Sequence, residues 1–190
     1  GGFSLTVYDA SPRAVDELAA HGAQRATSAA EAANCAETLF LSLPTPDIVH
    51  AVALGEGGIA EGSRVRHIFD CSTIGPEMAT TVAAGLAERG IAYLDAPVSG
   101  GIVKAREGTL AIIMGGEAEH CERVEPLLRS MGSRLFHSGP VGAGQVTKIV
   151  NNAIGIANIM ISAEAYRIAL DNGLGLDDVE RLSELLAASF

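Results

Sequence analysis

The chain has 190 residues, 48% of them hydrophobic and 19% charged, which suits a packed core in one domain, or in one domain plus part of another. The formal net charge of −10 argues against a nucleic-acid surface, because binding to phosphates needs clustered Lys and Arg side chains. We find no charge-free apolar run long enough to cross a membrane, so we expect neither nucleic acid nor a membrane among the partners.

Segments with the composition of strands alternate with segments that have helical spacing. In chain order, strands are predicted at residues 3–8, 38–43, 65–69, 92–94, 110–114 and 134–137. Helices are predicted at residues 12–21, 29–33, 76–89 and 118–131. The apolar strands lack a clean alternation, which indicates burial on both faces. The pattern therefore predicts an α/β fold with a Rossmann-like, doubly wound parallel sheet.

The pattern changes after Gly144, where strands give way to one helical stretch. Residues 145–172 contain no proline and keep helical character throughout, which predicts a long helix that opens an all-α domain. We place the domain boundary near Pro140. Residues 1–140 then form the sheet domain, and residues 141–190 form the start of the all-α domain.

One candidate site follows the strand predicted at residues 92–94. In a doubly wound sheet, ligands bind beyond the carboxyl ends of the strands. The segment from Asp95 to Gly101 reads Asp-Ala-Pro-Val-Ser-Gly-Gly. Its glycines let the backbone approach a ligand, successive N–H groups can bind an anion, and the Ser99 hydroxyl adds a donor. Composition alone favours an ordinary Gly-rich turn.

A second candidate site lies early in the long predicted helix. Lys148 and Asn152 are four residues apart, so they share one side of the helix. The neighbouring residues are apolar, and a partly desolvated Lys favours its neutral form, which suits proton transfer near neutral pH. A snorkelling Lys beside a solvated Asn is the commoner arrangement. Asn151 and Asn152, however, are poor helix formers inside an apolar helix and need a local reason to be there.

Four segments taken together resemble a known family. They are the segment from Asp95 to Gly101, Gly-Thr-Leu at 108–110, Met-Gly-Gly at 114–116, and Gly-x-Gly-x-x-x-Lys-x-x-Asn-Asn at 142–152. In this order and spacing they resemble the β-hydroxyacid dehydrogenases, which include 3-hydroxyisobutyrate dehydrogenase and tartronate semialdehyde reductase. The similarity runs from Phe3 to the end of the chain. Each segment is weakly specific alone, and the combination is specific.

The resemblance implies an NAD(P)-dependent oxidoreductase that transfers hydride between nicotinamide and a small 3-hydroxy acid such as 3-hydroxyisobutyrate. Lys148 would be the general acid/base, and Asn152 would hold the substrate oxygen with Asn151 close by. Three residues, Ser99, Gly100 and Gly101, would bind the substrate carboxylate. Three others would line the cofactor: Leu43, Pro44 and Thr73.

Asp9 bears on the choice of cofactor. It ends the first predicted strand, where a carboxylate accepts hydrogen bonds from the adenosine ribose hydroxyls and repels a 2′-phosphate. We therefore expect NAD, and NADP less, with Arg13 keeping NADP possible as a minor alternative. Asp9 also suits a cap for the helix predicted at 12–21, and the two roles are compatible.

The resemblance also implies segments that this chain lacks. The family begins with a strand and a G-x-G-x-x-G turn that holds the pyrophosphate, and this chain starts after that turn. The family's C-terminal helices are absent too. Residues 1–140 would thus be an N-terminally incomplete dinucleotide-binding domain, and residues 141–190 the start of a substrate and dimerisation domain. We expect the piece alone to bind cofactor poorly.

Alternatives stay open within and beyond the family. A reductase of tartronate semialdehyde, succinic semialdehyde or glyoxylate would use the same residues. A 6-phosphogluconate dehydrogenase is less favoured, because Val150 stands where such relatives place His. Imine reductases usually lack the Lys. From another class, a truncated, non-catalytic remnant acting as an interaction module is the rival reading.

The remaining features concern environment and assembly. The chain has three cysteines, which are far apart and lack C-x-x-C spacing. This pattern predicts reduced thiols in a cytoplasmic protein, and no metal site. The helix predicted at 145–172 is apolar around much of its circumference. One domain would not cover all of that surface, and the family packs such helices between subunits. We therefore expect a homodimer or homotetramer, with a small carboxylate-bearing molecule as substrate.

Overall fold

The structure is a computed structural model that describes residues 2–175, 177–178 and 181. The chain divides into two compact units, Gly1–Ile149 and Val150–Phe190. The first unit extends past the boundary expected near residue 140. It does so because helix α7 (Ala143–Asp171) begins with three buried residues, Gly144, Gln145 and Lys148, which belong to the first unit.

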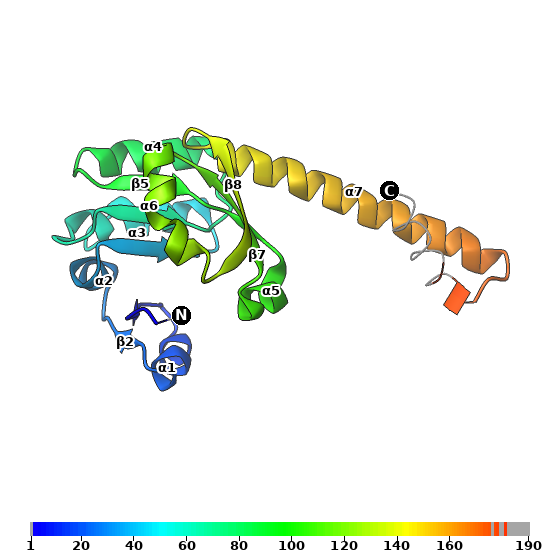
Figure 1. Cartoon of the computed structure of the whole chain (residues 1–190), viewed down its shortest axis with the longest axis horizontal. Helices are drawn as coiled ribbons and strands as arrows, with labels where there is room; N and C mark the ends of the chain where they lie inside the picture. Colours follow the sequence, from blue (N-terminus) through cyan, green and yellow to red (C-terminus); the bar gives the residue numbers. More distant parts are fainter. Residues whose placement is uncertain (1, 176, 179–180, 182–190) are drawn as a thin grey trace. The chain divides into compact units, whose positions relative to one another are not determined.

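The first unit is built on a six-stranded sheet, shown in Figure 1. Its strands are β3 (Thr38–Leu41), β4 (His67–Asp70), β5 (Ala92–Asp95), β6 (Val98–Ser99), β7 (Leu110–Gly115) and β8 (Gly132–Gly139). β3, β4 and β5 are parallel neighbours in that order, as expected for a doubly wound sheet. β7 and β8 are also parallel to each other. The predicted α/β, Rossmann-like fold is therefore confirmed.

One part of the sheet runs in the opposite direction. β7 is antiparallel to β5 and to β6. The cause is the connection: a short helix, α5 (Gly101–Glu107), follows β6, and the chain turns back along the same sheet. The expectation that residues 110–114 form a further parallel strand of the sheet is therefore wrong for the pairing of β7 with β5 and β6.

A second, two-stranded sheet holds the N-terminal residues. β1 (Thr6–Val7) and β2 (Gln24–Arg25) are parallel and are connected through helix α1 (Pro12–Ala20). Within the residues that the structure describes, neither strand pairs with the six-stranded sheet. Arg25 and Asp16 form an ion pair that links β2 to α1.

Helices cover both faces of the six-stranded sheet. Alternate residues of β4 and β5 point to opposite sides: Ile68 and Tyr93 pack in one apolar cluster, and Phe69 and Leu94 pack in another. The first cluster contains buried residues of α2 (Ala29–Cys35), α3 (Pro46–Leu54) and α4 (Pro76–Ala87). The second contains buried residues of α6 (Ala118–Leu128). Burial on both faces explains why the strands show no alternation.

Local capping explains where the helices begin. The Ser28 hydroxyl accepts a hydrogen bond from the N–H of Glu31, and the Glu31 carboxylate accepts one from the N–H of Thr27 at 2.6 Å, which together cap α2. Thr45 caps α3 by accepting from the N–H of Ile48 at 3.3 Å, and proline follows it at the first helical position. α3 was not predicted, although this Thr-Pro signal marks its start.

In the second unit, the described part of α7 carries large apolar side chains that are exposed. They include Val150, Ile154, Ile156, Ile159, Met160, Ile161, Ile168 and Leu170. By length and composition alone, α7 is also apolar enough to cross a membrane, a test that core helices of soluble proteins pass as well. Figure 1 shows α7 as one unbroken helix.

Candidate functional site

The ends of β3 and β4 bring the predicted cofactor-lining residues together. The backbone N–H of Leu43 donates to the Ser72 hydroxyl oxygen at 2.8 Å, which joins the turn after β3 to the turn after β4. Leu43 is half-buried, and Pro44 and Thr73 are exposed. These three residues therefore lie on two adjoining turns beyond parallel strands, where such sheets bind ligands.

Asp70 stabilises the turn that carries Thr73. One carboxylate oxygen accepts from the backbone N–H of Ser72 at 2.9 Å, and the other accepts from the Tyr93 hydroxyl at 2.9 Å. Burial, together with the neighbouring carboxylate of Asp70, raises the pKa of the Tyr93 hydroxyl, so that group remains a donor. Both carboxylate oxygens of Asp70 are thus used by its own turn and by β5, as is usual for an Asp at the end of a strand.

Asp95 connects the sheet to the long helix. Its Oδ1 accepts from the backbone N–H of Gly142 at 2.7 Å, and its Oδ2 accepts from the N–H of Gln145 at 2.8 Å. The residue is fully buried. Burial raises the pKa of the Asp95 carboxyl, and the two hydrogen bonds oppose that shift. Asp95 thus fixes the first turn of α7 at the end of β5, and both of its oxygens are occupied.

Gln145 was not singled out from the sequence. Its side chain is fully buried and forms hydrogen bonds to the turn after β4, with Ile74, Gly75 and Ser72 as partners. The available signal was a polar residue directly after Gly142-Ala-Gly, in a position where the helix starts against the sheet. That signal is weak, because the partners lie 70 to 73 residues earlier in the chain.

The Ser99-Gly100-Gly101 segment joins β6 to α5. Ser99 pairs with Ala111 of β7 and is half-buried. Gly100 and Gly101 have φ angles of 133° and 66°, which L side chains rarely adopt. A Cβ on Gly100 would also lie 2.8 Å from the Cβ of Lys104. The two glycines are therefore required by the backbone itself, and their role toward a substrate carboxylate stays a prediction.

Lys148 is the charged residue that α7 buries. Only 9% of it is exposed, and burial lowers its pKa. The residues that bury Lys148 are not the apolar neighbours on α7 that were expected to do so. Val146 and Ile149, expected to desolvate the amine, are exposed, whereas Gly144 and Gln145 share the buried side of the helix with Lys148. The sheet unit rather than the apolar stripe of α7 therefore desolvates Lys148.

Three other predicted residues, Asp9, Asn151 and Asn152, are exposed. Asn151 and Asn152 belong to the second unit and are exposed on α7. Asp9 follows β1, and its Oδ1 accepts from the backbone N–H of Ser11 at 2.7 Å. That bond closes a turn before the helix, because Ser11 is the N-cap of α1 and no side-chain cap bond is made there. The helix-cap interpretation of Asp9 is therefore wrong. The role of Asp9 toward a ribose, and those of the two asparagines toward a substrate, stay predictions.

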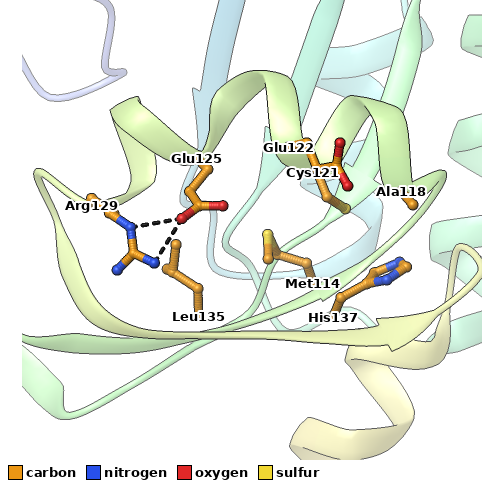
Figure 2. Close-up of a pocket in the computed structure, with 8 residues that line it drawn as sticks. All are labelled: Met114, Ala118, Cys121, Glu122, Glu125, Arg129, Leu135 and His137. Atoms are coloured by element: carbon orange, nitrogen blue, oxygen red, sulfur yellow. Dashed lines mark hydrogen bonds and ion pairs between the residues drawn. The ribbon is translucent and has the colours of Figure 1, made fainter.

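A separate cavity of about 220 Å³ lies between α6 and strands β7 and β8, as Figure 2 shows. Its lining consists of Met114, Ala118, Cys121, Glu122, Glu125, Arg129, Leu135 and His137. None of the predicted site residues is among these. Glu125 and Arg129 pair with each other across one helical turn at 2.7 Å. The cavity therefore does not coincide with the predicted site residues.

Comparison with known proteins identifies the family of the chain. Residues 1–139 match a family model described as the NAD binding domain of 6-phosphogluconate dehydrogenase. A 3-hydroxyisobutyrate dehydrogenase of Pseudomonas aeruginosa is 42% identical over 189 residues, which are 99% of this chain and 62% of that protein. An NAD-dependent L-serine dehydrogenase of the same organism is 42% identical over 193 residues, with the same coverage of 99% and 62%.

The same similarity appears among solved structures. The 3-hydroxyisobutyrate dehydrogenase of Mycobacterium tuberculosis, solved with L-serine, has a TM-score of 0.85 and 34% identity to this chain. The match covers 92% of this chain and 59% of that one. The chain therefore spans about three fifths of the length of the proteins that it matches (62% of each curated relative).

Proposed function

The chain belongs to the β-hydroxyacid dehydrogenase family, and from this premise we propose that the whole protein is an NAD-dependent oxidoreductase of small 3-hydroxy acids. One observation carries the proposal: Lys148 is buried, on a helix whose first turn is anchored at the carboxyl end of β5. Hydride transfer to or from the carbon that bears the substrate hydroxyl is the chemistry that a bound nicotinamide would supply.

The proton of that hydroxyl needs an acceptor as the hydride leaves. Lys148 meets the requirement because burial lowers its pKa, which increases its neutral fraction near physiological pH. The Nζ atom takes the proton, and a carbonyl product forms. In the opposite direction, the protonated amine returns the proton to the carbonyl oxygen. Asn152, one turn further along α7, would hold that oxygen, with Asn151 beside it.

The carboxylate of the substrate needs donors that do not take part in the transfer. Ser99 supplies a hydroxyl, and Gly100 and Gly101 bring backbone N–H groups close because neither has a side chain. Binding of this kind orients the hydroxyl-bearing carbon and contributes equally before and during the reaction.

The turns after β3 and β4 fit a nicotinamide cofactor. Leu43 and Pro44 offer apolar contact, Thr73 offers a hydroxyl, and the hydrogen bond between Leu43 and Ser72 holds the two turns together. Asp9 keeps acceptor capacity on its carboxylate beyond the bond to Ser11, which suits ribose hydroxyls and disfavours a 2′-phosphate. We therefore propose NAD rather than NADP.

The names of two relatives suggest two candidate substrates. 3-Hydroxyisobutyrate is the first candidate, and L-serine is the second, because two relatives named for these activities are equally similar to this chain, at 42% identity. Both molecules carry a carboxylate and a hydroxyl on the next carbon but one, as the proposed site requires. Reduction of a semialdehyde or of glyoxylate would use the same groups in the reverse direction.

Steady-state kinetics of the whole protein test the proposal. NADH formation is followed with 3-hydroxyisobutyrate and with L-serine, and kcat/KM is compared between NAD+ and NADP+. Oxidation of either acid with a preference for NAD+ supports the proposal. A clear preference for NADP+ contradicts the role of Asp9, and no turnover with any hydroxy acid or aldehyde supports the non-catalytic alternative.

We also propose that a second copy of the chain covers the exposed apolar residues of α7. Ile154, Ile159, Ile161 and Ile168 are among the large apolar side chains that α7 leaves in contact with solvent. A surface of that kind is typical of a subunit interface. Light scattering should show a dimer or tetramer in solution. A monomer at micromolar concentration, or association with lipid vesicles instead, contradicts it.

The cysteines support a cytoplasmic location for the protein. Cys35, Cys71 and Cys121 are all free thiols, and reduced thiols are typical of that compartment. Cell fractionation tests this proposal, and recovery of the protein in the membrane fraction contradicts it.

A further inference from the structure

Gln145 is a buried amide that is bonded at both ends to one turn of the sheet. Its Oε1 accepts hydrogen bonds from the backbone N–H groups of Ile74 and Gly75, at 2.9 and 3.2 Å. Its Nε2 donates to the backbone carbonyl oxygen of Ser72 at 2.9 Å. The side chain therefore holds the turn on both sides of Thr73, a residue predicted to line the cofactor.

The backbone of Gln145 is held from a second direction. Its N–H donates to Asp95 at the end of β5, at 2.8 Å. Gly144, just before it, packs so closely on the sheet that a Cβ there would lie 2.6 Å from the carbonyl oxygen of Ile113. The first turn of α7 thus packs directly on the sheet, and Gln145 is bonded to the end of β5 and to the turn after β4.

Lys148 follows Gln145 by three residues, so the two side chains leave neighbouring positions on the same side of α7. Both are buried, at 0% and 9% exposure. Any shift or rotation of the first helical turn therefore moves the amine of Lys148. It also breaks the bonds to the turn that carries Thr73.

We propose that Gln145 is a positioning residue, which sets the place of Lys148 relative to the cofactor-lining turn at Thr73. The inference rests on the function proposed above. Gln145 touches neither substrate nor cofactor in this account; it acts through Lys148 and Thr73. Because productive geometry is strict, a displacement of about 1 Å can lower a rate by about 100-fold.

The chemistry of the side chain explains why an amide is used. Two N–H groups need an acceptor and one carbonyl needs a donor, and a primary amide supplies both from one planar group. A carboxylate at the same place would lose the donor toward Ser72 and would bring a charge into a fully buried position. Methionine matches the length of Gln145 but offers neither strong donor nor strong acceptor.

The test compares Gln145→Met and Gln145→Glu with Leu128→Val in the whole protein. Leu128 is fully buried in the cluster around α6, so its replacement lowers stability without touching the turn at Thr73. Three quantities are measured: Tm, kcat, and the pH dependence of amine labelling at Lys148 by peptide mass spectrometry. The exposed Lys104 serves as the internal reference for labelling.

We expect Gln145→Met to lower kcat by about 10- to 100-fold. Labelling of Lys148 should shift toward the pH at which an ordinary lysine reacts, while labelling of Lys104 stays unchanged. Leu128→Val should lower Tm and leave kcat and both labelling profiles as in the wild type. Gln145→Glu, which keeps the length and can still accept, gives the same comparison if Gln145→Met does not fold.

Equal losses of Tm in Gln145→Met and Leu128→Val, with wild-type kcat and wild-type Lys148 labelling in both, would overturn the proposal and leave Gln145 a purely structural residue. The proposed function and the positioning role of Gln145 can fail independently of each other. If the wild-type protein oxidises no hydroxy acid, the proposed function fails. The labelling of Lys148 in the Gln145 variants then still decides whether Gln145 positions that amine.

Discussion

The carboxylate of Asp95 accepts a hydrogen bond from the backbone N–H of Gln145 at 2.8 Å, although 50 residues separate them in the sequence. A second bond, from the N–H of Gly142 at 2.7 Å, uses the other carboxylate oxygen. Hydrogen bonds to a charged acceptor are stronger than neutral ones. One buried side chain at the end of β5 thus holds the start of the helix that carries Lys148.

Replacing Asp95 should therefore destabilise the sheet unit. Asp95→Ala leaves two buried N–H groups without an acceptor, and each such group costs about 1–3 kcal/mol. We expect a loss of several kcal/mol in the free energy of unfolding, measured by urea denaturation. Glu56→Ala, at an exposed position, is the control and should change little. An Asp95→Ala variant as stable as the control would show that these bonds do not anchor α7.

Ser99 should affect substrate binding more than catalysis. A hydrogen bond to a charged group contributes about 1.5–3 kcal/mol, so Ser99→Ala should raise KM for the hydroxy acid about 10- to 100-fold. kcat should fall less, because the bond exists before and during the reaction. Ser130→Ala, which removes an exposed hydroxyl bonded to its own helix, is the control. An unchanged KM with a collapsed kcat would contradict the carboxylate assignment.

The alternation of elements was readable from the sequence because it depends on local composition. Six of the strands were expected close to where they lie, whereas the two-residue strands β2 and β6 were not predicted. Pro76 marked the first residue of α4. The direction of β7 was not readable, since a buried parallel strand and a buried antiparallel strand have the same apolar composition. The antiparallel pairing is set by the short connection through α5, which the sequence analysis did not recognise as a helix.

Only part of the candidate site could be predicted from the sequence, because the rest depends on tertiary contacts. Lys148 stood out because a Lys in an apolar helix is unusual, and its burial agrees with that expectation. The sequence could not predict which residues bury Lys148, because the side of α7 that faces the sheet depends on tertiary contacts. Gln145 was missed because all three of its side-chain partners lie in the turn after β4.

The three thiols should differ sharply in reactivity. Burial raises the pKa of Cys71 to about 12 and that of Cys121 to about 11, whereas Cys35 is exposed. The thiolate is the reactive form, so near neutral pH we expect an aromatic disulfide reagent to label Cys35 first. Peptide mass spectrometry after brief labelling gives the order. Modification of Cys71 as fast as Cys35 would contradict the packing at the end of β4.

His67 should make the fold sensitive to acid. Its ring lies 5.2 Å from the ring of His120, a contact that the sequence analysis did not expect. Burial lowers the pKa of His67, and His120 and Arg123 lower it further, while Glu37 opposes the shift. As the pH falls, His67 therefore becomes protonated in the unfolded chain at a higher pH than in the folded chain. The resulting stability is present above the ordinary histidine pKa of about 6.5 and is lost as the pH falls below it.

Urea denaturation at about pH 7.5 and about pH 5.5 brackets that value and tests the effect. His67→Gln should lose less stability between the two conditions than the wild type does. His50→Gln, at an exposed position on α3, should lose as much as the wild type. An unaltered pH dependence in His67→Gln would show that protonation of His67 is not linked to folding.

Lys148 is central to the account, and its pH behaviour follows from its burial. Because burial lowers its pKa below the ordinary value of 10.5, the neutral amine is populated at lower pH than for an exposed lysine. The rate of hydroxy-acid oxidation should therefore rise with pH as Lys148 loses its proton, and should level off below that ordinary value. Reduction of the carbonyl product, which needs the protonated amine, should show the opposite slope.

The most direct test is the kcat of Lys148→Ala in the whole protein, measured together with NADH affinity by fluorescence. Positioned general acid–base catalysis contributes roughly 10²–10⁴-fold, so we expect kcat to fall by about that factor while the affinity for NADH stays near wild type. Lys148→Arg should not restore activity, because Arg remains protonated. If Lys148→Ala keeps more than about a tenth of the wild-type kcat, another group moves the proton and the assignment of Lys148 is wrong.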